Sequence, residues 1–171
     1  MTITVWNLGH DLGFVTQLRE RGCEVTCLPA TASARDIKRT HPDAIVIAGG
    51  DADPAEHTDK LPVINDLFGK FPILGVGLGH DLVALARGGT VAKLPEPHDG
   101  EDIPVTAHQQ KFTTAQAHSY VVTDEPSGTL PVYRHGADRT CEGIFYTTRY
   151  CLTVAFPPND AVLDRFFALI K

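Results

Sequence analysis

Short apolar runs alternate with helix-like segments through the first half of the chain. Four short runs are predicted to be strands, and the last two have the near-continuous apolar character of strands that are buried on both faces of a sheet. These runs are ITVWNL (3–8), EVTCLPA (24–30), DAIVIAGG (43–50) and PILGVGL (72–78). The intervening segments predict helices, one beginning near Leu12, one capped by Ser33, and two spanning residues 56–70 and 80–89. Strand alternating with helix predicts a mostly parallel sheet with helices on both sides.

The second half has a different pattern, with short strand candidates separated by proline, glycine and polar turns. The candidates are TVAKL, KFTTAQA, SYVVT, LPVYRH, EGIFYTT and CLTVAF. Residues 95–104 are predicted to form a polar loop, and residues 159–171 a closing amphipathic helix capped by Asn159 or Asp160. We therefore expect one α/β domain over residues 1–171, with antiparallel strands added to the parallel sheet.

Composition and charge narrow the possible partners. The 171 residues carry a formal net charge of −6, with a pI of about 5.7, which disfavours binding to nucleic acid or an anionic membrane. No apolar run approaches the roughly 20 residues of a membrane span, and MTITVWNLGHD lacks the features of a secretory signal. Without a second matching cysteine pair, buried free thiols in a reducing cytoplasm are expected. The cysteines are Cys23, Cys27, Cys141 and Cys151.

The run Gly75-Val76-Gly77-Leu78-Gly79, followed by His80, has the form of a nucleophile elbow. In such an elbow a buried strand turns sharply into a helix, and the central residue, held in a strained conformation, presents the attacking side chain. The helix N-terminus supplies N–H groups for an oxyanion. Here the central position is Gly77, which has no side chain to attack with.

The elbow and four further segments, taken in order along the chain, resemble class I glutamine amidotransferases, and in particular the carbamoyl-phosphate synthase small subunit. The family's elbow reads Gly-Ile-Cys-Leu-Gly-His-Gln, against Gly75–Asp81 here. The other matching segments are RERGCEVTCLPATASARDI (19–37), HPDAIVIAGGDADPAE (41–56), TTAQAHSYVV (113–122) and CLTVAFPPND (151–160). The resemblance implies a flavodoxin-like three-layer sandwich.

The resemblance also implies a mechanism whose residues are absent here. In the family a cysteine thiolate attacks the glutamine amide, a histidine activates it, and a glutamate orients the histidine. Those three positions are Gly77, Pro157 and Asn159. Cys151 lies roughly 20 Å back along its strand by strand rise, and Cys141 falls in a polar turn, so neither replaces the nucleophile. We expect no catalytic residues.

The emptied site leaves a candidate ligand pocket. Its candidate residues come from the elbow, the oxyanion loop and the TTAQAHSYVV segment. They are Gly49, Gly50, Asp51, Gly77, Leu78, Gly79, His80, Asp81, Gln116 and His118. Asp81 replaces the family's substrate-holding glutamine; it is either an ordinary acidic residue in the first turn of a helix or a charge that repels glutamine.

Nothing in the histidine spacing indicates a metal site. His80 and His118, with Asp51 and Asp81, could surround the pocket, and histidine with carboxylate would suit a metal or an acid–base pair. No HxxxH-type spacing occurs, so packed side chains and polar pocket walls are the preferred interpretation. His98 lies among Asp99, Glu101 and Asp102 in the segment expected to be a polar loop, so this cluster is expected to be solvated. No metal or cofactor is therefore predicted.

Three functions follow from these observations. The first is an inactive amidotransferase-like scaffold or regulatory subunit, with a synthetase-like partner or a second copy of the chain, since the resemblance implies docking on a synthetase. The second is a repurposed enzyme or small-molecule binder that uses the emptied pocket. The third, an active glutaminase, is disfavoured because losing a nucleophile or its base costs such a triad on the order of a millionfold in turnover.

Overall fold

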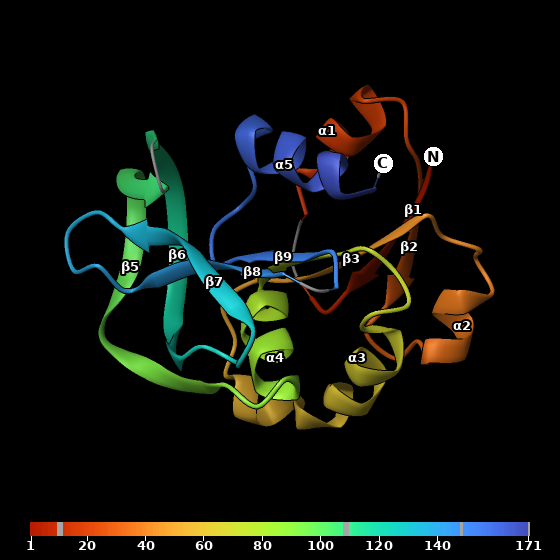
Figure 1. Cartoon of the computed structure of the whole chain (residues 1–171), viewed down its shortest axis with the longest axis horizontal. Helices are drawn as coiled ribbons and strands as arrows, with labels where there is room; N and C mark the ends of the chain where they lie inside the picture. The colour runs from red at the N-terminus through yellow and green to blue at the C-terminus, as the bar shows by residue number, and fades with distance from the viewer. Residues whose placement is uncertain (10–11, 108–109, 148, 171) are drawn as a thin grey trace.

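A computed structural model describes residues 1–9, 12–107, 110–147 and 149–170 (Figure 1). Its strands form one sheet in the order β2-β1-β3-β4-β9-β8-β7-β5-β6. Neighbours from β2 through β9 in this order pair in parallel, and those from β9 to β6 pair antiparallel. The chain therefore combines a parallel α/β layer with an antiparallel extension, as its hydrophobic pattern predicts.

The five parallel strands come from the apolar runs. They are β1 (Thr2–Asn7), β2 (Glu24–Pro29), β3 (Ala44–Gly49), β4 (Ile73–Gly77) and β9 (Cys151–Val154). The antiparallel part adds β5 (Thr90–Ala107), β6 (Gln110–Asp124), β7 (Thr129–His135) and β8 (Cys141–Tyr146). In Figure 1, β5 and β6 form a long pair that stands apart from the helices at one end of the sheet.

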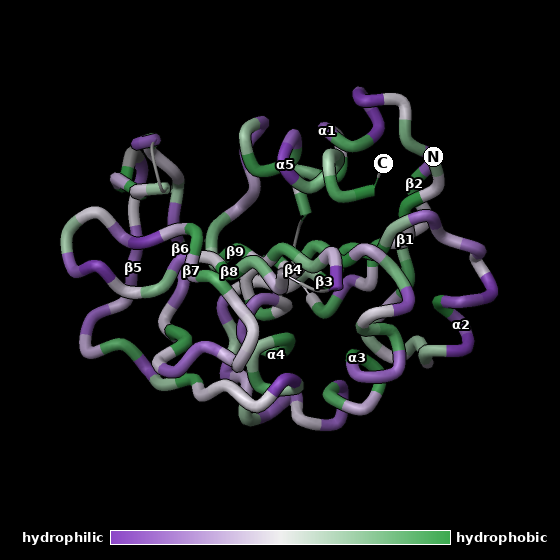
Figure 2. Tube along the Cα trace, in the orientation of Figure 1, coloured by the Kyte–Doolittle hydropathy of each residue, from purple (hydrophilic) through white to green (hydrophobic). Residues whose placement is uncertain are grey.

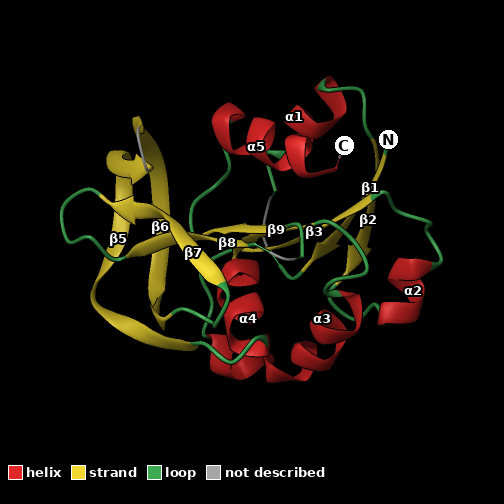
Figure 3. Ribbon diagram, in the orientation of Figure 1, coloured by secondary structure: helices red, strands yellow, loops and turns green. Residues whose placement is uncertain are grey.

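Helices cover both faces of the parallel layer (Figure 3). One face carries α1 (Val15–Glu20) and α5 (Asp160–Ile170), and the other carries α2 (Ala34–Lys38), α3 (Leu61–Leu67) and α4 (Leu78–Ala86). A 3₁₀ helix, η1 (Pro54–Lys60), precedes α3. No helix in the described part of the chain has both the length and the apolar character needed to cross a bilayer.

Two hydrophobic clusters result from the alternation of side chains along the central strands. In β3, Val46 packs with the cluster under α1 and α5, whereas Ile45 and Ile47 pack with the one above α3 and α4. Every residue of β3 is buried, which explains why its sequence is continuously apolar. Figure 2 shows this apolar character along the centre of the sheet.

Three sequence predictions need correction. The polar loop expected at 95–104 is part of β5, whose register shifts between Lys93 and His98 and between Gly100 and Ile103 accommodate the prolines and the glycine. The two strands expected from KFTTAQA and SYVVT are a single strand, β6. The helix expected over 56–70 is instead the 3₁₀ helix η1 followed by α3, and η1 itself is kinked at His57, whose backbone angles are non-helical.

Candidate functional site

The turn from β4 into α4 has the strained geometry that the elbow pattern predicts. Gly77 caps α4 with φ 58° and ψ −118°, a region that side chains rarely adopt. A Cβ atom placed on Gly77 would overlap the carbonyl oxygen of Gly49, which belongs to the neighbouring strand β3. The elbow is therefore closed to a side chain as well as lacking one.

Close packing also explains the second glycine of the elbow. A Cβ on Gly79 would overlap the carbonyl oxygen of Ile47, so the first turn of α4 lies directly against β3. Because both contacts involve backbone atoms of β3, a side chain at either position would require the strand or the helix to move.

A cavity of about 540 Å³ lies beside the elbow. Four of the predicted pocket residues line it, namely Gly49, Gly50, Asp51 and Gly77. Pro157, at the position of the family's histidine, lines the same cavity, so the two replaced positions do meet in space. Leu78, Gly79, His80, Asp81, Gln116 and His118 are not among the lining residues.

Asp51 joins the two sides of this region. Its Oδ1 accepts the backbone N–H of Ser119 at 3.0 Å, and its Oδ2 accepts the Ser119 hydroxyl at 2.6 Å. Asp51 follows β3, whereas Ser119 lies in β6, so these bonds connect the oxyanion-loop segment to the antiparallel pair. Both oxygens of the carboxylate are thus engaged within the protein.

Asn159, at the position of the family's glutamate, is a helix cap. Its Oδ1 accepts the backbone N–H of Val162 at 3.0 Å, at the start of α5. This confirms the predicted capping role and explains the residue without reference to catalysis.

The buried cysteines do not supply a substitute nucleophile. Burial raises the pKa of Cys141 to about 12, and burial raises the pKa of Cys151 still further. Cys151 lies in β9, and Cys141 begins β8 and is buried, so the polar turn expected for it is wrong; neither lines the cavity. Both thiols stay protonated at neutral pH, where only the thiolate would attack.

His80 and Asp81 lie buried beneath the elbow. His80 Nδ1 is 2.8 Å from the Thr153 hydroxyl, and burial lowers the pKa of this histidine to about 3. Burial raises the pKa of Asp81 to about 7, and its Oδ1 is buried without a hydrogen-bond partner among the described residues. Because Asp81 is buried and does not line the cavity, its position gives no support to the predicted repulsion of glutamine.

Gln116 and His118 face away from the cavity, into a buried polar cluster. Ala117, the residue between them, lines the cavity, and side chains alternate between the two faces of a strand. His118 Nε2 lies 3.1 Å from Gln116 Oε1 and 3.3 Å from Glu142 Oε1, and Gln116 donates to Glu142 Oε2 at 3.0 Å. Glu142, in β8, is completely buried.

His98 belongs to the same cluster, so its predicted solvated loop is wrong. The His98 side chain is 7% exposed; its Nδ1 lies 3.0 Å from Glu142 Oε1 and its Nε2 2.6 Å from Asp138 Oδ2. Asp99 and Glu101 are exposed as expected, and the side chain of Asp102 lies outside the described part. Burial opposes charge on His118, but hydrogen bonding to Glu142 raises its pKa overall.

Sequence reasoning missed Glu142, Asp138 and His98 as members of one cluster. The available signal was Glu142 itself, a charged residue inside the otherwise apolar run CEGIFY. A charge in such a position requires buried partners. The partners come from β5, β6 and the turn between β7 and β8, so no spacing could identify them.

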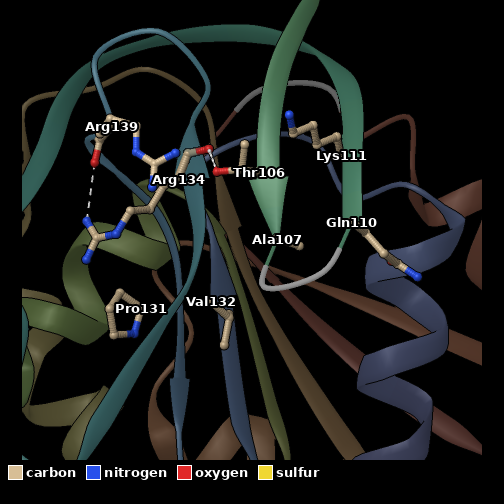
Figure 4. A pocket seen from close by; sticks show the side chains of 8 residues that line it. All are labelled: Thr106, Ala107, Gln110, Lys111, Pro131, Val132, Arg134 and Arg139. Atoms are coloured by element: carbon tan, nitrogen blue, oxygen red, sulfur yellow. Dashed lines mark hydrogen bonds between the residues drawn. The ribbon is translucent and has the colours of Figure 1, made fainter.

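A second cavity, of about 470 Å³, lies on the antiparallel part of the sheet (Figure 4). Its lining includes Lys111, Arg134 and Arg139, and Arg134 donates to the carbonyl oxygen of Arg139 at 3.3 Å. None of the predicted site residues lines it. Arg134 therefore already has partners within the protein, because it also lies 3.5 Å from the Glu125 carboxylate.

Comparison with known proteins gives consistent matches. The family model for glutamine amidotransferase class-I matches residues 12–158. A carbamoyl phosphate synthase small chain of Bacillus caldolyticus is 34% identical over 182 residues, which cover 99% of this chain and 50% of that protein. The arginine-specific small chain of Bacillus subtilis is 34% identical over 162 residues, covering 92% of this chain and 46% of that one. The chain thus spans about half the length of the curated relatives that it matches.

Solved structures share the fold at low sequence identity. A protein from Thermoplasma acidophilum, described as a candidate GMP synthase subunit, superposes with a TM-score of 0.84 at 22% identity, covering 99% of this chain and 94% of that one. A glutamine amidotransferase from Thermotoga maritima gives 0.72 at 16% identity, covering 97% and 81%. These matches agree with the predicted flavodoxin-like α/β sandwich.

Proposed function

Since the chain belongs to the glutamine amidotransferase class-I family, we propose that it is a member that has lost glutamine hydrolysis and acts by binding. Its role would be that of a scaffold or regulatory subunit, in the cytoplasm, where its free thiols would stay reduced. The proposal rests on the chemistry that its own elbow can and cannot perform.

The main support for the proposal is that the elbow has no room for a side chain. The nucleophile position is Gly77, and the Gly49 carbonyl oxygen lies too close for the Cβ of any side chain. Covalent attack needs a nucleophile held within reach of a general base. Here the attacking atom is absent, and the space that would hold it is filled by backbone.

The proton-transfer positions support the same conclusion. Pro157 has no group that takes up or releases a proton, and the Asn159 amide is used in capping α5. Replacing nucleophile and base together leaves, in comparable enzymes, only the small residual rate that binding provides.

The relatives suggest what the chain binds. They are small chains of carbamoyl phosphate synthase, and a synthetase-like large chain is the corresponding partner for this protein. A second copy of the chain is the alternative partner. Either way, the fold would be retained for its surface, and the loss of the catalytic residues would be tolerated.

The first test is an assay of ammonia and glutamate release by the purified chain, alone and mixed with a large synthetase chain from the same organism. We expect no release above buffer in either case. Native mass spectrometry of the same mixtures is expected to detect a complex with the large chain or a homo-oligomer. Glutamine turnover that is lost on changing a cavity residue would contradict the proposal.

A second function is favoured by the cavity itself. About 540 Å³ is within the range of small-molecule sites, and it is lined by Gly49, Gly50 and Gly77 with the Asp51 carboxylate beside them. A thermal-shift screen of amino acids and nucleotides tests this function, because a ligand at 100 times its Kd adds about 2.7 kcal/mol of stability. A flat screen would count against it.

A further inference from the structure

The buried cluster behind the cavity wall brings together three potential metal ligands from three strands. The atoms are Nδ1 of His98 in β5, Nε2 of His118 in β6 and Oε1 of Glu142 in β8. We propose that these three atoms bind a divalent transition-metal ion of the zinc type. The site is separate from the elbow and does not depend on the function proposed above.

The spacing of the three atoms matches the face of a tetrahedral site. His98 Nδ1 lies 3.0 Å from Glu142 Oε1 and 3.4 Å from His118 Nε2, and the latter lies 3.3 Å from the same carboxylate oxygen. Two atoms bound to one tetrahedral zinc at its usual bond lengths are about 3.3–3.6 Å apart. Small side-chain adjustments would therefore accommodate the ion.

The outer nitrogens of both rings already have the partners that metal-binding histidines use. His98 Nε2 is 2.6 Å from the Asp138 carboxylate, and His118 Nδ1 is 3.1 Å from the Tyr120 carbonyl oxygen. Such partners take the ring hydrogen and leave the other nitrogen free to bind the metal. Both inner nitrogens then point lone pairs toward Glu142.

The number of hydrogens on the His98 and His118 rings explains why this cluster would bind a cation. Each of the four ring nitrogens of His98 and His118 faces an acceptor oxygen, yet two neutral imidazoles carry only two hydrogens. Without a metal, at least one of the two inner nitrogens needs an extra proton or must accept a hydrogen from the other across 3.4 Å. A divalent cation bound by both lone pairs and by the Glu142 carboxylate satisfies all three groups at once, and its binding would release any proton held there.

The ligand types select the class of ion. Two imidazoles and one carboxylate, with a fourth position left for water or for the Gln116 amide oxygen, form a set that zinc commonly takes. Calcium and magnesium favour oxygen-only sites, so they are expected to bind poorly.

A neighbouring set, His98, His135 and Asp138, is less suited to a metal. The Nδ1 atom of His135 lies within hydrogen-bond reach of the backbone N–H groups of Ala137 and Asp138, at 3.2 and 3.4 Å. Its lone pair is therefore already engaged, and Asp138 serves the first set as the partner of His98.

The test uses the whole chain, stripped with a chelator and titrated with Zn²⁺ by calorimetry. We expect one saturable equivalent per chain, a raised Tm with Zn²⁺, and no comparable effect of Mg²⁺. X-ray absorption at the zinc edge is expected to report two imidazole ligands. Absence of a saturable equivalent in the stripped wild type would overturn the proposal, whatever the variants do.

Substitutions test which residues form the proposed metal site. Glu142→Gln and His98→Gln are expected to abolish binding, and Asp138→Asn, which keeps all three ligands, to weaken it about 10- to 100-fold. His57→Gln changes a histidine in η1 and serves as the matched control, with unchanged binding. Wild-type-like binding by folded Glu142→Gln and His98→Gln would also overturn the proposal. If either variant fails to fold, the half-exposed Asp138→Asn variant and the wild-type absorption spectrum decide the outcome.

Discussion

A Cβ atom on Gly77 would overlap the carbonyl oxygen of Gly49. Gly77 ends β4 and Gly49 ends the adjacent strand β3, where the two residues are register partners. The nucleophile position of the fold is thus held closed by the backbone of the neighbouring strand. The effect of placing a side chain at this position can therefore be measured as a change in stability.

Gly77→Ala is expected to destabilise the protein by about 1–3 kcal/mol or more, because the φ of +58° strains any side chain and the Gly49 oxygen must move. Gly13→Ala is the matched control, since Gly13 also lines the cavity but a Cβ there meets nothing within 4 Å. Urea denaturation of both variants measures the difference. Equal stability of the two would show that the elbow opens easily.

Restoring the family's residues is not expected to restore catalysis. The variant combining Gly77→Cys, Pro157→His and Asn159→Glu gains a nucleophile, a base and an orienting acid, but Gly49 obstructs the first and α5 loses its cap. We expect no ammonia release from glutamine. The measurement is an ammonia assay on folded variant protein, with wild type as the blank, and release above that blank would contradict this expectation.

The parallel half of the fold could be predicted from the sequence because most of its strands are apolar throughout and are followed by their own helices. β5 could not, because Pro95, Pro97 and Gly100 are typical of a loop when read locally. Its pairing with β6 and β7, together with its bulges, decides the structure there. Tertiary hydrogen bonding overrides local preference in such a segment.

The candidate site, like the fold, could be predicted from the sequence only in part. Gly77 and Pro157 could be associated because the family resemblance assigns them to two positions of one catalytic site, and the structure shows that β4 and β9 are paired neighbours in the sheet. The His98–Glu142 contact could not be foreseen, since 44 positions separate the two residues and nothing in their local sequences refers to the other. The alternation of side chains along β6 turns His118 toward Glu142 and Ala117 toward the cavity. One strand therefore contributes to both the buried polar cluster and the cavity, which only the structure reveals.

Thiol accessibility provides an independent check of the fold around the elbow. Cys27 is exposed, so the expectation that all four thiols are buried is wrong for this residue, whereas Cys23, Cys141 and Cys151 are buried with raised pKa values. Because alkylation requires a reachable thiolate, we expect iodoacetamide to modify Cys27 first and the other three only on unfolding. Peptide mass spectrometry over time measures the order. Early modification of Cys151 would contradict its burial in β9.

Asn159→Ala is expected to cost about 0.5–2 kcal/mol of stability, because the N–H of Val162 loses its acceptor at the start of α5. Asn159→Asp keeps a capping oxygen at the same distance from the backbone and serves as the control, with most of the stability retained. Denaturant unfolding measures both. If the aspartate variant is as unstable as the alanine variant, the cap is not what Asn159 contributes.

Asp81 is expected to make stability depend on pH. Burial raises its folded pKa to about 7 from an ordinary 3.8, so between these values the unfolded chain releases a proton that the folded chain keeps. Stability is therefore lost as pH rises through this window, by at most ~4 kcal/mol for the difference between 7 and 3.8. Asp81→Asn cannot ionise, so its unfolding free energy relative to wild type should increase from pH 5 to pH 8. Urea titrations at both pH values measure this increase, and a constant difference would mean that Asp81 ionises normally in the folded protein.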